Sequence, residues 1–455
     1  MARIFPFRGY RYDAQRFELA RVLTQPYDKI TPEMQERYYA LDPHNLVRVE
    51  KGRAQPGDGS EDNVYTRAAH TLDAWIREGS LRRDAAPSLY VCSQEFKLPS
   101  ALPPHREGER RVRRGVLALA GLEDYSSGVV LRHEQTLAGP RADRLELLRH
   151  TRAHTGQIFM LFDDAEDRVS ALLSRAMRAA PENELTDEFG VVHRLWPVSE
   201  PQEVQAFVSA LADKQLLIAD GHHRYETALA FRDECRASAP AVRGDFSAPY
   251  EKILVTLFPL QDSGVVVLPT HRAVRGIPGF DFATFRKSLE GVFDWYAYPF
   301  TSDAERKSAL AELRHDLAAR EKGPAGLRAL GAYAGGNVFF LFVLRRMADL
   351  ATLLEAVPAP QRSLDVVLLH RLLLEKKLGV TPEAVEREQH ITYHREAEEA
   401  CAAVDRGQAQ IAFLLNAVPV RQVYELAAAG SVLPQKSTDF YPKLLSGLVL
   451  YRLED

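Results

Sequence analysis

The chain contains 455 residues, of which 46% are hydrophobic and 26% are charged. This composition is close to the average for folded proteins and predicts a core of ordinary size, while the length predicts two or three domains. The formal net charge of −4 weighs against a protein that mainly binds nucleic acid, because such proteins usually carry an excess of basic residues.

The three cysteines, Cys92, Cys235 and Cys401, lie far apart and form no CxxC motif. An odd number of cysteines gives no complete disulfide framework, which favours a reducing cytoplasm. The N-terminal segment MARIFPFRGYRYDA lacks the apolar core of a signal peptide. No apolar run approaches the roughly 20 residues of a membrane helix. We therefore expect a cytoplasmic protein.

Residues 1–125 are predicted to form a first α+β region. Its beginning is irregular, and Thr31 precedes a proline at the start of a short helix. Two apolar segments, 88–96 and 115–125, are predicted to be strands. The connector between them contains five arginines that could contact phosphate. Given the acidic total charge, we interpret it instead as a solvated hairpin loop.

Residues 126–275 alternate between strand-like and helix-like segments, which predicts an α/β or α+β core. Residues 276–455 have a mixed pattern and are predicted to form a third region. The strands expected in these two regions are 128–137, 157–164, 189–198, 216–219, two within 250–274, a hairpin-like pair within 327–344, and 409–416. The expected helices are 140–156, 167–180, 201–213, one that begins after residue 221, 363–379 and 420–430.

The most informative stretch is ADGHHRYET, which follows an apolar strand and begins a helix. Phosphate binds readily at the first turn of a helix, where backbone N–H groups are free and the helix dipole is positive. Gly221 allows a tight turn, Arg224 could hold phosphate oxygens, and His222 and His223 could transfer protons. Asp220 could hold Mg²⁺. The alternative is a helix capped by Asp220, with histidines that are hydrogen-bonded inside the protein.

A second polar cluster, RHEQT, ends another expected strand. Glu134 in this cluster could act as a general base toward a hydroxyl group, although a glutamate at a strand end is more often simply solvated. On the following helix, Arg144 could orient a ligand or form an ion pair with Asp143.

Two further clusters suit an anion site. PTHR follows an apolar strand and contributes His271 and Arg272. Near the C-terminus, PQKSTDFYPK places two lysines and two hydroxyl groups before an apolar run, although a surface loop can have the same composition. The residues of this last cluster are Lys436, Ser437, Thr438 and Lys443. The P-loop, the kinase glycine-rich loop and the HExxH motif are absent from the sequence.

Six segments, taken together and in order, resemble the prokaryotic family called domain of unknown function 1015. They are TQPYDKI, LRHEQTL, IADGHHRYETAL, VLPTHRAV, LDVVLLH and QKSTDFYPKLLSGLV. The resemblance runs over nearly the whole chain, and ADGHHR and KST-x-FYPK are its most specific parts. Two positions depart from the family pattern: Asp439 stands where an aromatic residue is expected, and His154-Thr155 where an asparagine is expected.

The DGHHR element, with HE at an upstream strand end, also resembles the free serine kinases of the ParB/sulfiredoxin superfamily. This resemblance implies an α+β (mixed α/β) fold with a ParB/sulfiredoxin-like catalytic core at 126–275. Additional α+β parts would lie at 1–125 and 276–455, and the second of these would complete the site. In sulfiredoxin the corresponding turn reads Gly-Cys-His-Arg. Because His222 takes the place of that cysteine, we expect no cysteine-based sulfinic acid chemistry.

The resemblance implies a phosphotransferase that phosphorylates the hydroxyl group of free L-serine, or that runs the reverse reaction. The donor would be a nucleotide (ATP or ADP) or a polyphosphate, with Mg²⁺ held by Asp220. Glu134 would be the base, and the turn with His222, His223 and Arg224 would hold the phosphate. The residues expected to bind substrate or phosphate are His133, Thr136, Arg144, Gly221, Thr227, His271, Arg272, Lys436, Ser437, Thr438 and Lys443.

Two other functions remain open. A metal-dependent hydrolase could use His222 and Glu226, which lie on one face of a helix, with His133 or His271 completing the site. A non-catalytic nucleotide-binding regulator of the ParB type would bind nucleotide without turnover. In each case we expect a small-molecule partner, no membrane and no nucleic acid, and the sequence is compatible with a homo-oligomer.

Overall fold

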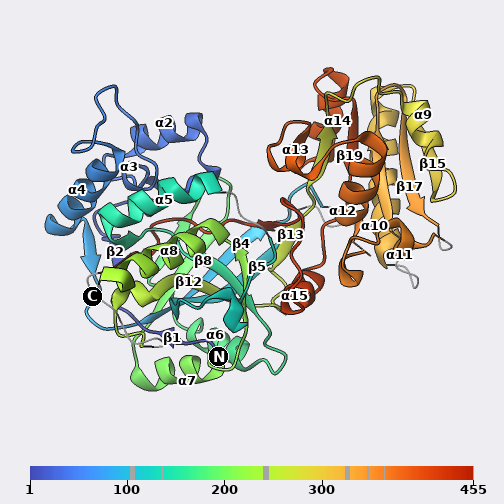
Figure 1. The fold of residues 1–455 in the computed structure, drawn as a ribbon. Coiled ribbons are helices and arrows are strands. Elements are labelled where there is room, and N and C mark those ends of the chain that lie inside the picture. The colour runs from blue at the N-terminus through green and yellow to red at the C-terminus, as the bar shows by residue number, and fades with distance from the viewer. Residues whose placement is uncertain are drawn as a thin grey trace.

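The computed structural model describes residues 1–102, 108–134, 138–238, 245–322, 328–345, 348–362 and 364–453. These residues form a larger body and a smaller lobe that lie side by side (Figure 1). Strands and helices both occur along the whole described chain, and the mixed α/β class expected from the sequence is confirmed. No helix among the described residues is long and apolar enough to cross a membrane.

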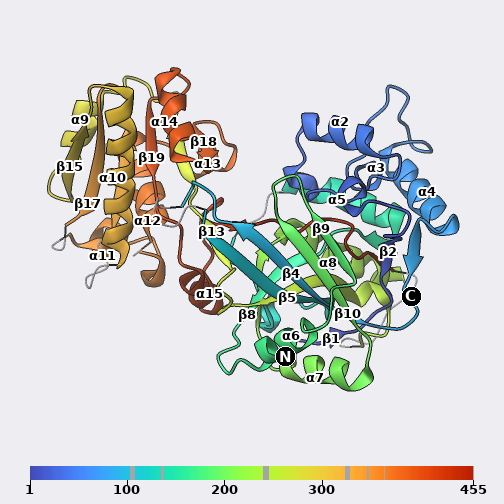
Figure 2. The same ribbon diagram turned by 180° about the vertical axis from the view of Figure 1, so that it is seen from behind.

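The body is built on a nine-stranded sheet of order β6–β11–β8–β12–β5–β4–β10–β9, in which β1 also pairs with β5. Strands β4, β5 and β10 lie antiparallel across the body, and one end of the β4–β5 pair lies near the lobe (Figure 2). Because β4 and β5 pair with β10 and β12, residues on both sides of position 125 share this sheet. The strands are β1 (Ile4–Phe5), β4 (Leu89–Lys97), β5 (Arg110–Gly121), β6 (Val130–Leu131), β8 (Ile158–Phe162), β9 (Asn183–Thr186), β10 (Val192–Val198), β11 (Leu216–Asp220) and β12 (Lys252–Pro259).

Both faces of this sheet are covered, which explains its long apolar strands. Along β5, Leu117 and Leu119 pack into one apolar cluster while Val116 and Ala118 pack into another, as the two-residue period of a strand requires. Helices α6 and α7 cover the second cluster, α5 contributes to the first, and α8 contributes to both. The helices of the body are α1 (Leu19–Val22), α2 (Pro32–Leu41), α3 (Val47–Glu50), α4 (Val64–Arg77), α5 (Ala138–Thr151), α6 (Arg168–Ala176), α7 (Pro201–Leu211) and α8 (His222–Ser238). Short strands β2 (Tyr10–Tyr12) and β3 (Leu81–Arg83) pair beside them.

The arginine-rich connector joins two antiparallel strands, as the expected hairpin does, but one of its arginines is not solvated. Strand β5 begins at Arg110, and the side chain of Arg113 is fully buried over the rings of Phe159 and Phe258. Its guanidinium donates to the carbonyl oxygens of Tyr441 (3.2 Å) and Pro442 (2.6 Å). The buried guanidinium thereby holds the C-terminal segment against the sheet. Local composition does not reveal this contact, because its partners lie more than 300 residues away in the sequence.

The lobe contains a six-stranded antiparallel sheet of order β15–β17–β16–β19–β14–β18. Helices α10 and α14 cover one face, and α9, α12 and a π-helix pack on the other. The expected helix at 363–379 is thus α-helical only at its start. The strands are β14 (His271–Val274), β15 (Phe293–Pro299), β16 (Ala329–Tyr333), β17 (Val338–Leu344), β18 (Ile391–His394) and β19 (Ile411–Leu414). The helices are α9 (Phe282–Lys287), α10 (Asp303–Lys322), α11 (Leu350–Leu353), α12 (Asp365–Val367), the π-helix Leu368–Lys377, α13 (Pro382–Glu386), α14 (Ala397–Asp405) and α15 (Val420–Ala428).

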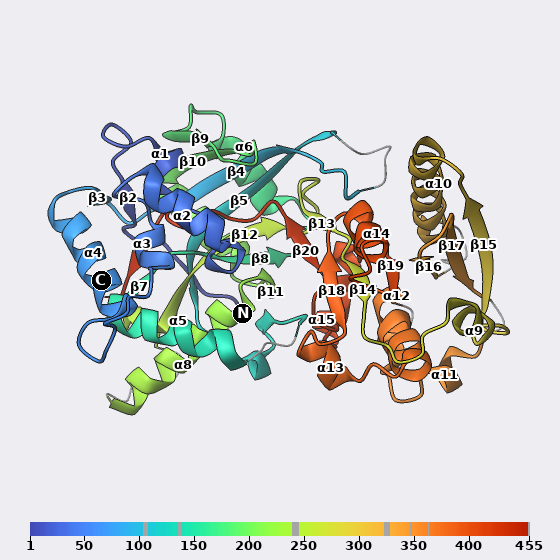
Figure 3. The ribbon, with the colours of Figure 1, turned by 90° about the horizontal axis from the view of Figure 1, so that it is seen from above.

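After the lobe, the chain returns to the body. Strand β20 (Asp439–Tyr441) pairs with β13 (Val266–Leu268), and β21 (Tyr451–Arg452) pairs with β7 (Ala153–His154). Seen from above, β20 lies between the body and the lobe (Figure 3). The described C-terminal end therefore lies on the body, as the N-terminus does (Figure 1).

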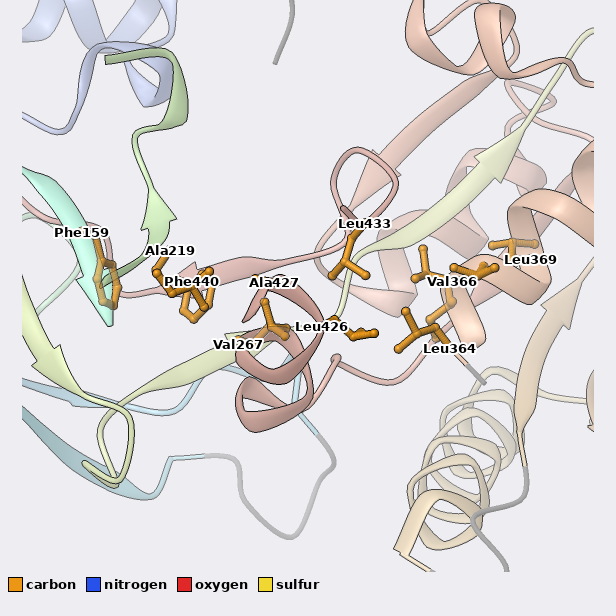
Figure 4. Packing of buried hydrophobic residues seen from close by; sticks show 14 of the residues in the cluster. Phe159, Ala219, Val267, Leu364, Val366, Leu369, Leu426, Ala427, Leu433 and Phe440 are labelled. Carbon is orange, nitrogen blue, oxygen red and sulfur yellow. The ribbon is translucent and has the colours of Figure 1, made fainter. Parts of the chain in front are cut away.

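One apolar cluster continues across the junction of body and lobe. Phe159 and Ala219 of the body meet Phe440 of the returning segment, and Leu433 leads on to Val366 of the lobe (Figure 4). Burial shared in this way stabilises the contact between two parts of a chain, because apolar surface of both parts is removed from water. The junction therefore fixes how the body and the lobe face each other.

We expect Phe440→Ala to lower the free energy of unfolding by about 3–5 kcal/mol, because the ring is 1% exposed and its removal leaves a cavity. The matched control is Phe189→Ala, whose ring is 60% exposed and whose loss should cost within about 0.5 kcal/mol. Urea denaturation of both variants measures the difference. Equal losses would contradict a packed junction at Phe440.

Candidate active site

The turn between β11 and α8 has the backbone geometry that the sequence predicts. Gly221 has φ of 99°, a left-handed conformation that favours glycine. A Cβ atom there would lie 3.1 Å from the Ile158 side chain and 3.2 Å from the Arg224 guanidinium. The carbonyl oxygen of Gly221 accepts from the N–H of Tyr225 at 3.0 Å, so helix α8 begins directly after it. The first-turn N–H groups of α8 have no partners within the helix.

This turn opens into a cleft of about 920 Å³ between the body, the lobe and the returning C-terminal segment. The body contributes residues 27–29, Glu134 and residues 220–224. The lobe contributes residues 393–396, and the returning segment contributes side chains between 435 and 443. Glu134, the DGHHR turn and the C-terminal lysines, far apart in the sequence, therefore line one cavity.

A chain of alternating charges runs through the cleft wall. Asp220 contacts Arg224 through Oδ2 (3.0 Å) and Lys443 through Oδ1 (2.9 Å). Lys443 also lies 3.2 Å from Asp439, which in turn contacts Arg395 of the lobe at 2.7 Å. Asp220, Lys443 and Asp439 thus each lie between two opposite charges, which offsets the cost of removing them from water.

The pKa values of the central pair follow from this arrangement. Burial alone would raise the pKa of Asp220, but the positive charges of Lys443 and Arg224 outweigh it and hold the pKa well below its usual range. Burial alone would lower the pKa of Lys443, but Asp220 and Asp439 raise it above its usual value. Both groups are therefore charged near neutral pH.

Glu134 lies in the cleft where the sequence interpretation needs a base. Burial raises the pKa of its carboxyl group, against the lowering effect of the Lys436 backbone N–H that donates to Oε1. Lys436 itself has φ of 56°, unusual for a residue other than glycine. Its carbonyl oxygen accepts from Arg272 Nη2 at 2.9 Å. The side chains of Glu134 and Arg272 thus bind the backbone N–H and the carbonyl oxygen of Lys436, which has a strained backbone conformation.

The two histidines nearest the turn differ in their partners. His133 is hydrogen-bonded at both ring nitrogens, Nδ1 to the carbonyl oxygen of Ile218 and Nε2 to the hydroxyl of Thr438, each at 2.8 Å. Burial lowers the pKa of His133 to about 4. His222 packs edge-on against His133, with 4.8 Å between ring centroids, and its buried Nε2 has no hydrogen-bond partner within the described residues. A group from outside the protein could satisfy Nε2, since His222 lines the cleft.

His223 also lines the cleft and is half-buried, and burial lowers its pKa. Arg224 points elsewhere than expected: Nη1 donates to the carbonyl oxygen of Gln157 (2.8 Å) and Nη2 to Asp220. Its guanidinium is committed to protein groups, so it positions Asp220 rather than presenting an open fork to phosphate.

Several predicted residues do not line this cleft. Arg144 donates to the carbonyl oxygen of Glu50 and, with Thr227, lines a small neighbouring cavity that Arg224 separates from the cleft. Ser437 donates to the carbonyl oxygen of Pro434. Arg272 is 1% exposed, and His271 faces a different cavity. Thr136 lies outside the described residues.

The structure adds cleft residues that the sequence interpretation gave no role. Lys29 lines the cleft beside Tyr27 and Asp28, and burial and the nearby Lys443 lower its pKa. Arg395 enters from the lobe. The segment TQPYDKI already contributed to the family resemblance, so it could have pointed to Lys29. Arg395 stands in a stretch of the lobe that no motif singled out.

The expected magnesium ligand does not fit this geometry. Both carboxylate oxygens of Asp220 contact positive side chains, so a cation bound there would lie beside Lys443 and Arg224. Within the described part of the chain, no three His, Cys, Asp or Glu side chains gather as a metal-binding set. Among the residues that were described, the pair His222 and Glu226 therefore lacks the third ligand that the hydrolase interpretation requires.

We expect Asp220→Asn to lower the free energy of unfolding at neutral pH by about 3–5 kcal/mol, since it leaves Lys443 and Arg224 without their shared counter-charge. The folded pKa of Asp220 is depressed, so its contribution is present above about pH 4 and is lost as the pH falls further. The difference between wild type and variant should therefore shrink below about pH 4.

Urea denaturation at several pH values measures this difference, and Asp213→Asn, at an exposed position, is the matched control. A wild-type-to-variant difference that stays constant between neutral and strongly acidic pH would contradict the ion-pair assignment.

Comparison with known proteins gives a family and distant structural likenesses. A conserved hypothetical protein from Pyrococcus furiosus is 15% identical with a TM-score of 0.34, covering 74% of this chain and 96% of its own. A free serine kinase in complex with AMP is 14% identical with a TM-score of 0.34, covering 73% and 92%. SbnI with a C-terminal truncation, from Staphylococcus aureus, is 9% identical with a TM-score of 0.32, covering 73% and 87%.

No curated protein matches the sequence. The family model described as protein of unknown function (DUF1015) matches residues 4–367, which is most of the chain. The resemblance seen in the six sequence segments is confirmed, and the chain belongs to the DUF1015 family.

Proposed function

We propose that this protein is a small-molecule phosphotransferase. It would transfer a phosphoryl group between a nucleotide or polyphosphate and the hydroxyl group of a free amino acid, which the sequence resemblance suggests is L-serine. The observation that carries the proposal is that Glu134, with a raised pKa, lines the same cleft as the N-terminal turn of α8. A base and an anion site must face each other for this reaction.

Three features support anion binding at one end of the cleft. The first-turn amides of α8 follow Gly221 and offer donors beside the positive end of the helix dipole. The buried Nε2 of His222 lacks a hydrogen-bond partner among the described residues. The ammonium groups of Lys29 and Lys436 also make no hydrogen bond or ion pair within those residues. These lysines are therefore available to oxygens of a bound phosphate.

The acceptor end of the cleft is formed around Glu134 and the lobe. A carboxylate with a raised pKa is a stronger base than an ordinary carboxylate. It therefore accepts the proton of a hydroxyl group more readily, because its pKa lies closer to neutral pH. The lobe adds Glu388, Glu396 and Glu399 to the lining. Carboxylates at this place favour an acceptor with an ammonium group, as a free amino acid has.

The acceptor hydroxyl oxygen forms a bond to the terminal phosphorus of the donor, and its proton passes to a carboxylate oxygen of Glu134. The bond between phosphorus and the bridging oxygen breaks, and the electron pair leaves with the shortened donor. Lys29, Lys436 and the α8 amides offset the charge on the transferred group, which is where most catalysis of phosphoryl transfer arises.

Glu134→Gln should reduce phosphoryl transfer by about 10²–10⁴-fold, the usual contribution of a general base, while nucleotide affinity stays nearly unchanged. Glu425→Gln, at an exposed position on α15, is the matched control. Transfer is followed by ³¹P NMR with candidate donors and L-serine, and affinity by calorimetry. A variant that turns over at the wild-type rate removes Glu134 from the base role. Nucleotide binding without any phosphorylated product in wild type would favour the regulator instead.

Lys29→Met and Lys436→Met should each weaken donor binding by roughly 10–100-fold, the loss expected for one hydrogen bond to a charged group. The salt dependence of binding should also become less steep, because one charge fewer contacts the phosphates. Lys97→Met, at an exposed position outside the cleft, serves as control. Calorimetric titration with ADP at two salt concentrations measures both effects. Unchanged affinity in both lysine variants would place the donor elsewhere.

A further inference from the structure

A second cavity, of about 480 Å³, lies at the junction of body and lobe, and the active-site cleft does not include it. The two are separated by the segment between β13 and β14. Thr270 of this segment lines the cleft, whereas Pro269 and His271 line the second cavity. Successive residues of an extended chain point to opposite sides, so one segment forms a wall of both cavities.

The walls of the second cavity are mostly apolar. The body contributes Leu102 and Val266, and the lobe contributes Leu317, Leu414 and Val418. A concave, largely apolar lining of this size with few polar groups is the usual form of a site for a small organic molecule.

The polar groups of the cavity include His271, which has an unsatisfied donor. Its Nδ1 accepts a hydrogen bond from the backbone N–H of Leu415 at 3.2 Å. A neutral imidazole that accepts at Nδ1 carries its proton on Nε2. This Nε2 is buried and has no partner within the described residues. Burial lowers the pKa of His271 to about 3, so the ring is neutral at physiological pH.

The second polar group is Arg314 of α10. Its Nη2 donates to the carbonyl oxygens of Ser100 and Leu102, the latter at 2.6 Å. Its Nη1 donates to the carboxylate of Glu398 at 3.4 Å, but Glu398 is 58% exposed, so water weakens its effect on the positive charge of Arg314. Burial is the main cause of the lowered pKa of His271, and the positive charge of Arg314 lowers this pKa further. The polar end of the cavity therefore combines an N–H donor with a positive charge.

We propose that this cavity is a binding site for a small, mostly apolar carboxylate. One carboxylate oxygen accepts from the Nε2–H of His271 near the guanidinium of Arg314, and the hydrocarbon part packs against Leu317, Leu414 and Val418. The assignment rests on charge complementarity and on the missing acceptor for His271. It is independent of the phosphotransferase proposal, because it uses none of the residues placed in that reaction.

The test uses decanoate and decylamine as probes, since they share a chain length and differ in the charge of the head group. Isothermal titration of the full chain should show saturable one-to-one binding of decanoate. Decylamine should bind at least about tenfold more weakly, because the site offers a donor and a positive charge rather than an acceptor.

Two variants locate the site. Val418 is half-buried at the cavity, so Val418→Trp should fill it and weaken decanoate binding at least about tenfold. Ala417→Phe, at the adjoining half-buried position, repeats the test should the first variant fail to fold. Val338→Trp, on strand β17 and outside both cavities, is the matched control and should bind as wild type does.

Three results would overturn the proposal. They are the absence of saturable decanoate binding up to millimolar concentration, equal affinity for decanoate and decylamine, and binding that neither folded cavity variant weakens. The last result would show that the apolar chain binds somewhere else on the surface. If ³¹P NMR detects no phosphoryl transfer, the binding test still applies, because neither the probes nor the calorimetric readout depend on that reaction.

Discussion

The row of alternating charges from Arg224 through Asp220, Lys443 and Asp439 to Arg395 is the interaction on which the rest of the cleft depends. It joins strand β11, the returning C-terminal segment and the lobe. Opposite neighbours allow each group to remain charged while buried. Because Lys443 lies at the middle of the row, the segment that carries it has to be held firmly, and the fully buried Arg113 holds that segment by its backbone carbonyl oxygens.

The local part of the site could be predicted from the sequence. An apolar strand, a glycine that can take a left-handed conformation and a helix start lie within a few residues, so Gly221 and the beginning of α8 followed from short-range rules. The use of Arg224 could not be predicted in the same way. Its partners are Asp220 and the carbonyl oxygen of Gln157, and the latter contact forms only once β8 lies beside β11.

Long-range pairing explains the other differences. His271 and Arg272 were expected to reach the same ligand as the DGHHR turn, but an extended segment sends neighbouring side chains to opposite sides. Thr270 therefore faces the cleft, His271 faces the second cavity, and Arg272 is buried against the carbonyl oxygen of Lys436. Asp439 stands where the family pattern has an aromatic residue, yet its carboxylate links Lys443 to Arg395. Such a role becomes visible only when all three segments are in place.

The route of the chain has a consequence for the order of events during synthesis. The body sheet takes its strands from residues 4–259, but the cleft also needs side chains of the lobe and of residues 435–443. A ribosome-bound chain could complete the sheet long before Lys436 and Lys443 have been made. During that interval Asp220 would lack the counter-charge of Lys443, and the lining of the cleft would be complete only after β20 has paired with β13.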